Sequence, residues 1–129
     1  MTTTLRFTMM TLLLALHGAS AIRQNGAKPL VLKDCDVPGV EGKAKCGTLE
    51  VYEDRAARKG RKINLNIVVL PATSAQREPD PLFYFAGGPG SAATEEAAGV
   101  AQMVGKTREH RDLVFVDQRG TGGSNPLNC

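Results

Sequence analysis

Apolar side chains recur at every second position in two segments near the middle of the chain, 48–53 and 63–70. This period of two is typical of half-buried β-strands. The polar segment 54–61 lies between them and contains Gly60, which favours a turn. The pattern therefore predicts a β-hairpin.

The pattern changes after Pro71. Segments 82–85 and 113–116 are continuous apolar runs, as expected for strands buried on both faces of a parallel sheet. Segment 92–106 is rich in Ala, Glu, Gln and Met and predicts a helix. Strand, glycine loop, helix and strand predict a right-handed βαβ unit. The expected fold class is α/β: an antiparallel hairpin followed by a βαβ unit of a mostly parallel sheet.

The amino-terminal segment has the pattern of a secretory signal peptide. Arg6 is followed by the apolar run 7–16 and by small residues at 19–21, so a signal peptide over 1–21 is expected. A membrane anchor is the alternative, but a bilayer span needs roughly 20 apolar residues. We expect a secreted or periplasmic protein with no membrane association after cleavage.

If the protein is exported, its three cysteines can form disulfides, because thiols pair in an oxidising compartment. Ten residues lie between Cys35 and Cys46, and Pro38 and two glycines are among them, so a local disulfide is expected. Cys129 is left over, which indicates an intermolecular bond, a free thiol or a missing partner. No further Cys or His stands at ligand spacing, so no metal site is expected.

Composition and charge restrict the possible functions. The chain is 42% hydrophobic and 22% charged, which is typical of a soluble globular protein, and its formal net charge is only +3. Five basic residues gather in and beside the predicted hairpin turn: Arg55, Arg58, Lys59, Arg61 and Lys62. Because no aromatic residue interleaves them and export is expected, a solvated turn is favoured over a nucleic-acid site.

Two glycine-rich loops follow the two apolar runs. The first reads Gly-Gly-Pro-Gly-Ser over 87–91, and the second reads Asp-Gln-Arg-Gly-Thr-Gly-Gly-Ser over 117–124. Glycines allow positive φ and close backbone approach, so the first loop fits either an oxyanion or an ordinary tight turn. In the second loop, Asp117 and Arg119 are expected to pair across the turn.

Together the two loops resemble those of the α/β-hydrolase serine peptidases of the prolyl aminopeptidase and tripeptidyl aminopeptidase group, over about 35–129. We expect an N-terminal lead-in with the local disulfide over 22–47. The resemblance implies an incomplete, N-terminal part of an α/β-hydrolase domain over 48–129. It makes Gly88 the oxyanion-hole amide and Gly87 part of the oxyanion loop. The residues that would support this loop are Pro89, Gly90, Asp117, Arg119 and Gly120. Ala86 departs from the usual His of prolyl aminopeptidases, which leaves the substrate preference open.

A hydrolase of this class needs a Gly-x-Ser-x-Gly elbow followed by an acid and a base. Ser91 and Ser124 stand in no such elbow, and His110 comes too early to be the base. The resemblance therefore implies the N-terminal fragment of an exported serine aminopeptidase. It would release residues or short peptides from peptide substrates by acyl transfer to a downstream Ser, without a cofactor. There are two alternatives. One is an esterase, and the other is a non-enzymatic exported domain that binds a small ligand.

Overall fold

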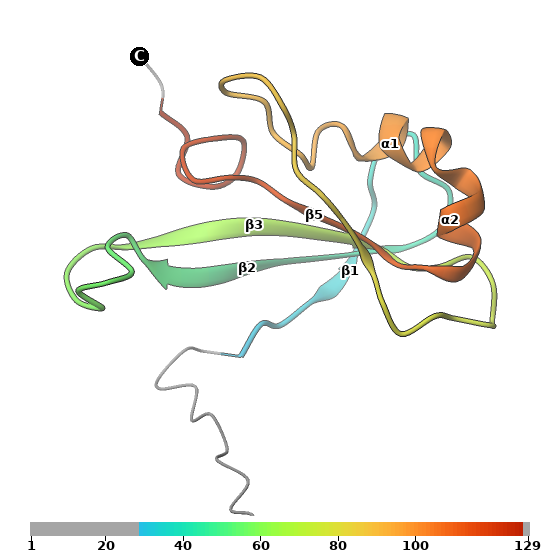
Figure 1. Cartoon of the computed structure of the whole chain (residues 1–129), viewed down its shortest axis with the longest axis horizontal. Helices are drawn as coiled ribbons and strands as arrows, with labels where there is room; N and C mark the ends of the chain where they lie inside the picture. Colours follow the sequence, from blue (N-terminus) through green and yellow to red (C-terminus); the bar gives the residue numbers. More distant parts are fainter. Residues whose placement is uncertain (1–28, 128–129) are drawn as a thin grey trace, which may run out of the picture.

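The computed structural model describes residues 29–127, which form one five-stranded sheet and two short helices (Figure 1). The predicted signal peptide and Cys129 lie outside the described residues. The elements are β1 (Lys33–Cys35), β2 (Ala44–Tyr52), β3 (Lys62–Leu70), β4 (Leu82–Tyr84), α1 (Ala97–Met103), α2 (Gly105–His110) and β5 (Leu113–Val116). Within this part of the chain, no helix has the length and apolar character that a bilayer span requires.

The sheet is mixed and mostly antiparallel, so the predicted fold class is wrong. Its order is β1-β2-β3-β5-β4, and β1–β2, β2–β3 and β3–β5 are antiparallel pairs. Only β4 and β5 run parallel. The hairpin joins the later strands in one sheet, and antiparallel contacts therefore dominate. The expected parallel sheet of an α/β-hydrolase domain is not found. A short apolar run indicates that a strand is buried but not the direction of its neighbours, which is why the sequence pattern gave the wrong prediction.

The predicted hairpin is confirmed. β2 and β3 pair over their length, with Leu49 opposite Leu65 and Val51 opposite Ile63, so the alternating apolar residues share one face. β2 begins at Ala44, earlier than the alternation indicates, because β1 pairs with this added part. The hairpin extends away from the helices, which lie at the other end of the sheet (Figure 1).

The single helix expected over 92–106 is two short helices. A turn precedes α1, which starts only at Ala97, and Val104 separates α1 from α2 with φ −106° and ψ 28°. A ψ of this value lies outside the α-helical region, so the hydrogen-bonded spiral breaks there.

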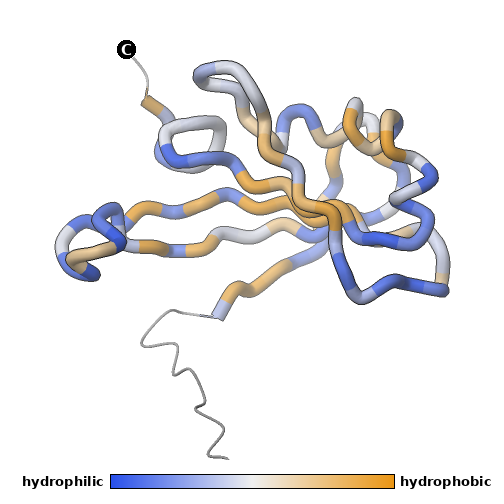
Figure 2. Tube along the Cα trace, in the orientation of Figure 1, coloured by the Kyte–Doolittle hydropathy of each residue, from blue (hydrophilic) through white to orange (hydrophobic). Residues whose placement is uncertain are grey.

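The hydrophobic core lies between α1 and the adjoining part of the sheet, where the apolar segments meet (Figure 2). Leu70, Leu113 and Phe115 are almost fully buried, and Val100 packs on them from α1. The Tyr84 ring lies against Phe115, with the centroids 5.8 Å apart. This packing fixes the ends of β4 and β5, from which both glycine loops depart.

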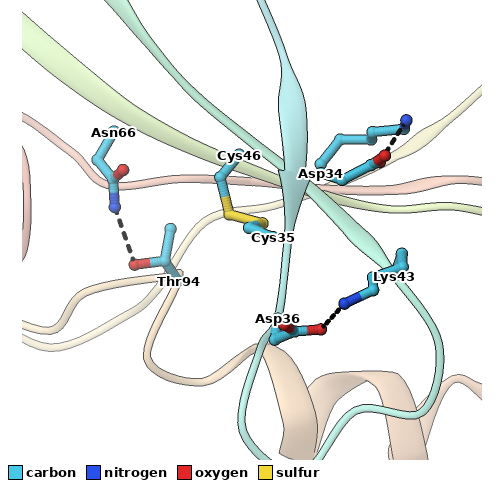
Figure 3. Close-up of a disulfide and its surroundings, with 8 residues drawn as sticks. Asp34, Cys35, Asp36, Lys43, Cys46, Asn66 and Thr94 are labelled. Carbon is cyan, nitrogen blue, oxygen red and sulfur yellow. Dashed lines mark hydrogen bonds and ion pairs between the residues drawn. A yellow bond between two sulfur atoms is a disulfide. The ribbon is translucent and has the colours of Figure 1, made fainter.

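Cys35 and Cys46, the pair expected from the sequence, form a disulfide between β1 and β2 (Figure 3). Beside it, Lys43 forms an ion pair with Asp36 at 2.6 Å. Both of these charged side chains are largely exposed, so their contribution to stability is small. The disulfide therefore adds a covalent link to the backbone pairing that holds the three-residue strand β1 on β2.

Replacing both cysteines, C35S/C46S, is expected to lower the free energy of unfolding by about 3 kcal/mol, because the unfolded chain regains the entropy of an open loop. Denaturant unfolding monitored by circular dichroism measures the loss. Wild-type protein treated with a reductant serves as the control and should match the variant. Equal stability of the oxidised and reduced wild type would contradict this prediction.

Candidate functional site

The first glycine loop leaves the carboxyl end of β4 and lies on the surface. Gly87, Gly88, Pro89 and Gly90 are all exposed. Gly88 and Gly90 have φ of +73° and +94°, the left-handed region that favours glycine. Within residues 29–127, the backbone N–H of Gly88 has no hydrogen-bond acceptor. The loop therefore holds an exposed amide that is available to an anion.

The loop does not lead directly into a helix, contrary to the expectation from the sequence. A turn over 93–96 separates it from α1, and Glu95 and Glu96 stand immediately before this helix. Glu96 makes no side-chain cap bond to this helix, and its carboxylate accepts the Tyr84 hydroxyl instead. Two carboxylates near this helix end repel an anion. The helix end therefore adds no anion site to the loop, and the amides of the loop itself are the remaining donors.

A hollow of about 450 Å³ lies beside β4 and α1. Tyr84, Glu95, Glu96, Val100 and Met103 line it, together with Gly99. The Tyr84 hydroxyl donates a hydrogen bond to Glu96 Oε2 at 2.5 Å. This bond raises the pKa of Tyr84 and fixes the Glu96 carboxylate at the hollow. The hollow thus combines an apolar wall with two acidic side chains.

Asp117 is fully buried directly after β5 and joins three segments of the chain. Its Oδ1 accepts the backbone N–H of Thr94 at 2.9 Å. Its Oδ2 accepts the Thr94 hydroxyl at 2.9 Å, the Asn66 side-chain amide at 3.0 Å and the Gly123 N–H at 3.0 Å. Asn66 lies in β3, and its amide also reaches the Thr94 hydroxyl (Figure 3). The carboxylate thereby ties the exit of the first glycine loop to the sheet and to the second loop.

Burial by itself would raise the pKa of Asp117. The hydrogen bonds from Asn66, Thr94 and Gly123 together lower the pKa by more than burial raises it, so the net shift is downward. The carboxylate is therefore ionised at neutral pH. All these donors are neutral groups, which shows that Asp117 needs no cation to remain charged.

The expected pairing of Asp117 with Arg119 is wrong. Arg119 instead donates from Nη1 to the Glu53 carbonyl at 2.7 Å and from Nη2 to the Tyr52 carbonyl at 3.4 Å. These carbonyls lie at the end of β2, which contacts the second loop only in the folded chain. The next residue, Gly120, has φ +84° and donates its N–H to the Ser124 carbonyl at 2.8 Å. Arg119 and Gly120 thus hold the second loop against the hairpin and closed on itself.

Sequence reasoning missed three residues of this bonded cluster: Asn66, Gly122 and Ser124. The Ser124 hydroxyl is buried, donates to the Asp117 carbonyl at 2.9 Å and accepts the Asn66 N–H at 2.7 Å. Gly122 has φ +44°, and a Cβ there would lie 2.5 Å from Asp117 Oδ2. A polar residue in an apolar strand and the repeated glycines were the available signals.

No catalytic pair of serine and histidine is assembled by residues 29–127. His110 is exposed at the end of α2, where its Nδ1 lies 3.0 Å from the Gln76 carbonyl, and it bonds to no serine. The Ser124 hydroxyl is occupied by its backbone partners. Within the same residues, no three side chains of His, Cys, Asp or Glu gather as metal ligands would.

No family model matches the chain, and no curated protein matches it in sequence. Its class is therefore defined by its own geometry. It is a mixed-sheet domain in which a buried carboxylate braces two surface glycine loops.

Replacing Asp117 by asparagine is expected to destabilise the protein by about 3 kcal/mol, because an amide N–H₂ would face donors where the carboxylate accepts. The lowered pKa of Asp117 also predicts a pH dependence. Its stabilisation is complete above about pH 4, the value for the unfolded chain, and is lost as the pH falls through the lower native pKa. Urea unfolding between pH 2 and pH 7 measures both effects.

The exposed Asp36 provides the control for this change, and D36N should alter the stability by less than about 1 kcal/mol. The wild type should lose more stability on acidification than D117N does. Identical acid profiles for the two proteins would show that the Asp117 carboxylate does not stabilise the fold.

Gly122→Ala is expected to cost about 3 kcal/mol, because the new Cβ would collide with Asp117 and Ala92. Gly42→Ala is the matched control, since Gly42 has φ +83° and open space at its Cβ position. Backbone strain alone predicts a cost of about 1 kcal/mol there. Thermal unfolding compares the two variants, and an equal loss would exclude a steric role for Gly122.

Proposed function

We propose that this chain supplies the oxyanion loop of an exported serine hydrolase that acts on the amino termini of peptides. The observation that carries the proposal is the exposed Gly88 amide, in a left-handed turn at the end of β4 and without an internal acceptor. The paired glycine loops, with their resemblance to the aminopeptidase group, support the choice of reaction. The serine and histidine of the reaction would lie outside this sequence.

In the proposed reaction, the serine hydroxyl attacks the peptide carbonyl carbon and its proton passes to the histidine base. The carbonyl π-electron pair moves to oxygen, and the Gly88 N–H donates a hydrogen bond to the oxyanion that forms. Such a donor accelerates acyl transfer because it is already oriented and stabilises charge that develops in the transition state. The oxyanion electron pair then re-forms the carbonyl, the C–N bond breaks, and the protonated base gives its proton to the leaving amine. Water, deprotonated by the same base, next attacks the acyl-serine ester, and the C–O bond to serine breaks to release the acid and restore the serine hydroxyl.

The anchored segment just beyond the loop also supports this role. Thr94 lies four positions beyond Gly90, and both its N–H and its hydroxyl donate hydrogen bonds to Asp117. Asp117 also accepts the Asn66 side-chain amide, which connects this segment to β3. An oxyanion donor is effective only when it is held in place before the reaction. The acidic hollow beside β4 supports a substrate with a free, cationic α-amino group, since Glu95 and Glu96 line it.

The test uses the complete open reading frame that contains this sequence. We expect it to encode a Gly-x-Ser-x-Gly elbow followed by Asp and His, and its purified product to hydrolyse aminoacyl or tripeptidyl p-nitroanilides. In that product, Gly88→Ala should lower kcat about 100-fold with little change in KM, because the strained turn would misdirect the amide.

Gly60→Ala is the matched control. Gly60 also has positive φ, +88°, and also has room for a Cβ, but it lies in the hairpin turn. It should leave kcat unchanged. A reading frame without a serine elbow would refute the proposal, and so would equal kcat values for wild type and Gly88→Ala.

A further inference from the structure

Charge is divided unequally between the hairpin tip, residues 53–62, and the rest of the described chain. The tip holds five basic and two acidic residues, a formal net charge of +3. The remaining residues of 29–127 hold eight basic and eleven acidic residues, a formal net charge of −3. The tip lies at the end of the molecule opposite the helices (Figure 1), where hydrophilic residues gather (Figure 2). The small total charge therefore conceals a basic projection.

Three of the five cations at the tip are available to a partner. Arg61 pairs with Glu53 at 3.7 Å, and Lys62 pairs with Glu50 at 2.7 Å. By contrast, no ion pair to a described residue involves Arg55, Arg58 or Lys59, and all three are exposed. Their charge is balanced only by solvent ions, which a multivalent anion would displace.

The tip is an ordered turn and not a loose loop. Asp54 Oδ1 accepts the N–H groups of Ala56 and Ala57, each at 2.9 Å, and the Asp54 carbonyl accepts the Arg58 N–H at 3.1 Å. Arg58 itself has φ +49°, an uncommon value for a residue other than glycine. The backbone that carries the free cations is thus fixed before any partner binds, which lowers the entropic cost of binding.

We propose that the hairpin tip is a docking site for an anionic polysaccharide that carries sulfate or phosphate groups. Arginine forms paired hydrogen bonds with such oxyanions, and lysine adds a compact charge. Nucleic-acid sites on single strands add aromatic stacking, but residues 53–62 include no aromatic residue. The nearby Tyr52 ring is occupied by Lys62, whose Nζ lies 5.2 Å from its centroid. This proposal does not depend on the proposed hydrolase function.

Heparin is the probe, and isothermal titration calorimetry at low salt measures its dissociation constant. We expect the double variant R55E/K59E to weaken binding at least about tenfold, since two attractions become repulsions. Arg58 is left unchanged to preserve its turn. The matched control is K33E/K106E, which replaces two exposed cations outside the tip and changes the net charge equally. It should weaken binding about twofold or less.

Circular dichroism spectra and melting curves verify that both variants fold. Equal weakening by the two variants would overturn the proposal, because net charge alone would then explain binding. So would the absence of heparin binding by the wild type. Tighter binding to a DNA duplex than to heparin would overturn the choice of partner. Salt-sensitive self-association that only R55E/K59E abolishes would instead assign the tip to the acidic body of a second copy.

Discussion

The buried carboxylate of Asp117 is the interaction on which the arrangement of both loops depends. It accepts hydrogen bonds from β3, from the turn after the first glycine loop and from the second loop, through Asn66, Thr94 and Gly123. A buried carboxylate is costly unless its oxygens are bonded. Because the donors come from three segments that are distant in the sequence, the carboxylate links the positions of these segments.

This coupling separates a rigid base from an accessible loop. The residues around Asp117 are closely packed, to the extent that Gly122 has no space for a side chain. Gly88 and Gly90, by contrast, stay exposed and have left-handed backbones. A fixed base below free amides is the arrangement that preorganised anion recognition requires. The structure therefore shows Asp117 bonded to the backbone on either side of this boundary, at Thr94 and Gly123.

The hairpin links this base to the basic tip. Arg119, two residues after Asp117, donates to the carbonyls of Tyr52 and Glu53 where the turn begins. The cation that sequence reasoning assigned to the buried carboxylate thus serves the hairpin instead. Neutral donors satisfy Asp117, and a guanidinium, which has several N–H groups, satisfies carbonyls at the end of a strand. The second loop thereby connects the anchored glycine loop to the protruding turn.

The sequence by itself determined what depends on neighbours along the chain. Alternation over 48–53 and 63–70 was sufficient for the hairpin, and the spacing of Cys35 and Cys46 for their disulfide. The tertiary structure alone decided the direction of the sheet, the break of the helix at Val104 and the partners of Asp117. Periodicity reports which side of an element is buried, whereas Asp117 and Asn66 are 51 positions apart and meet only when β3 and β5 pair. Which polar groups meet is fixed by packing, because each buried donor or acceptor must find its partner in the folded chain.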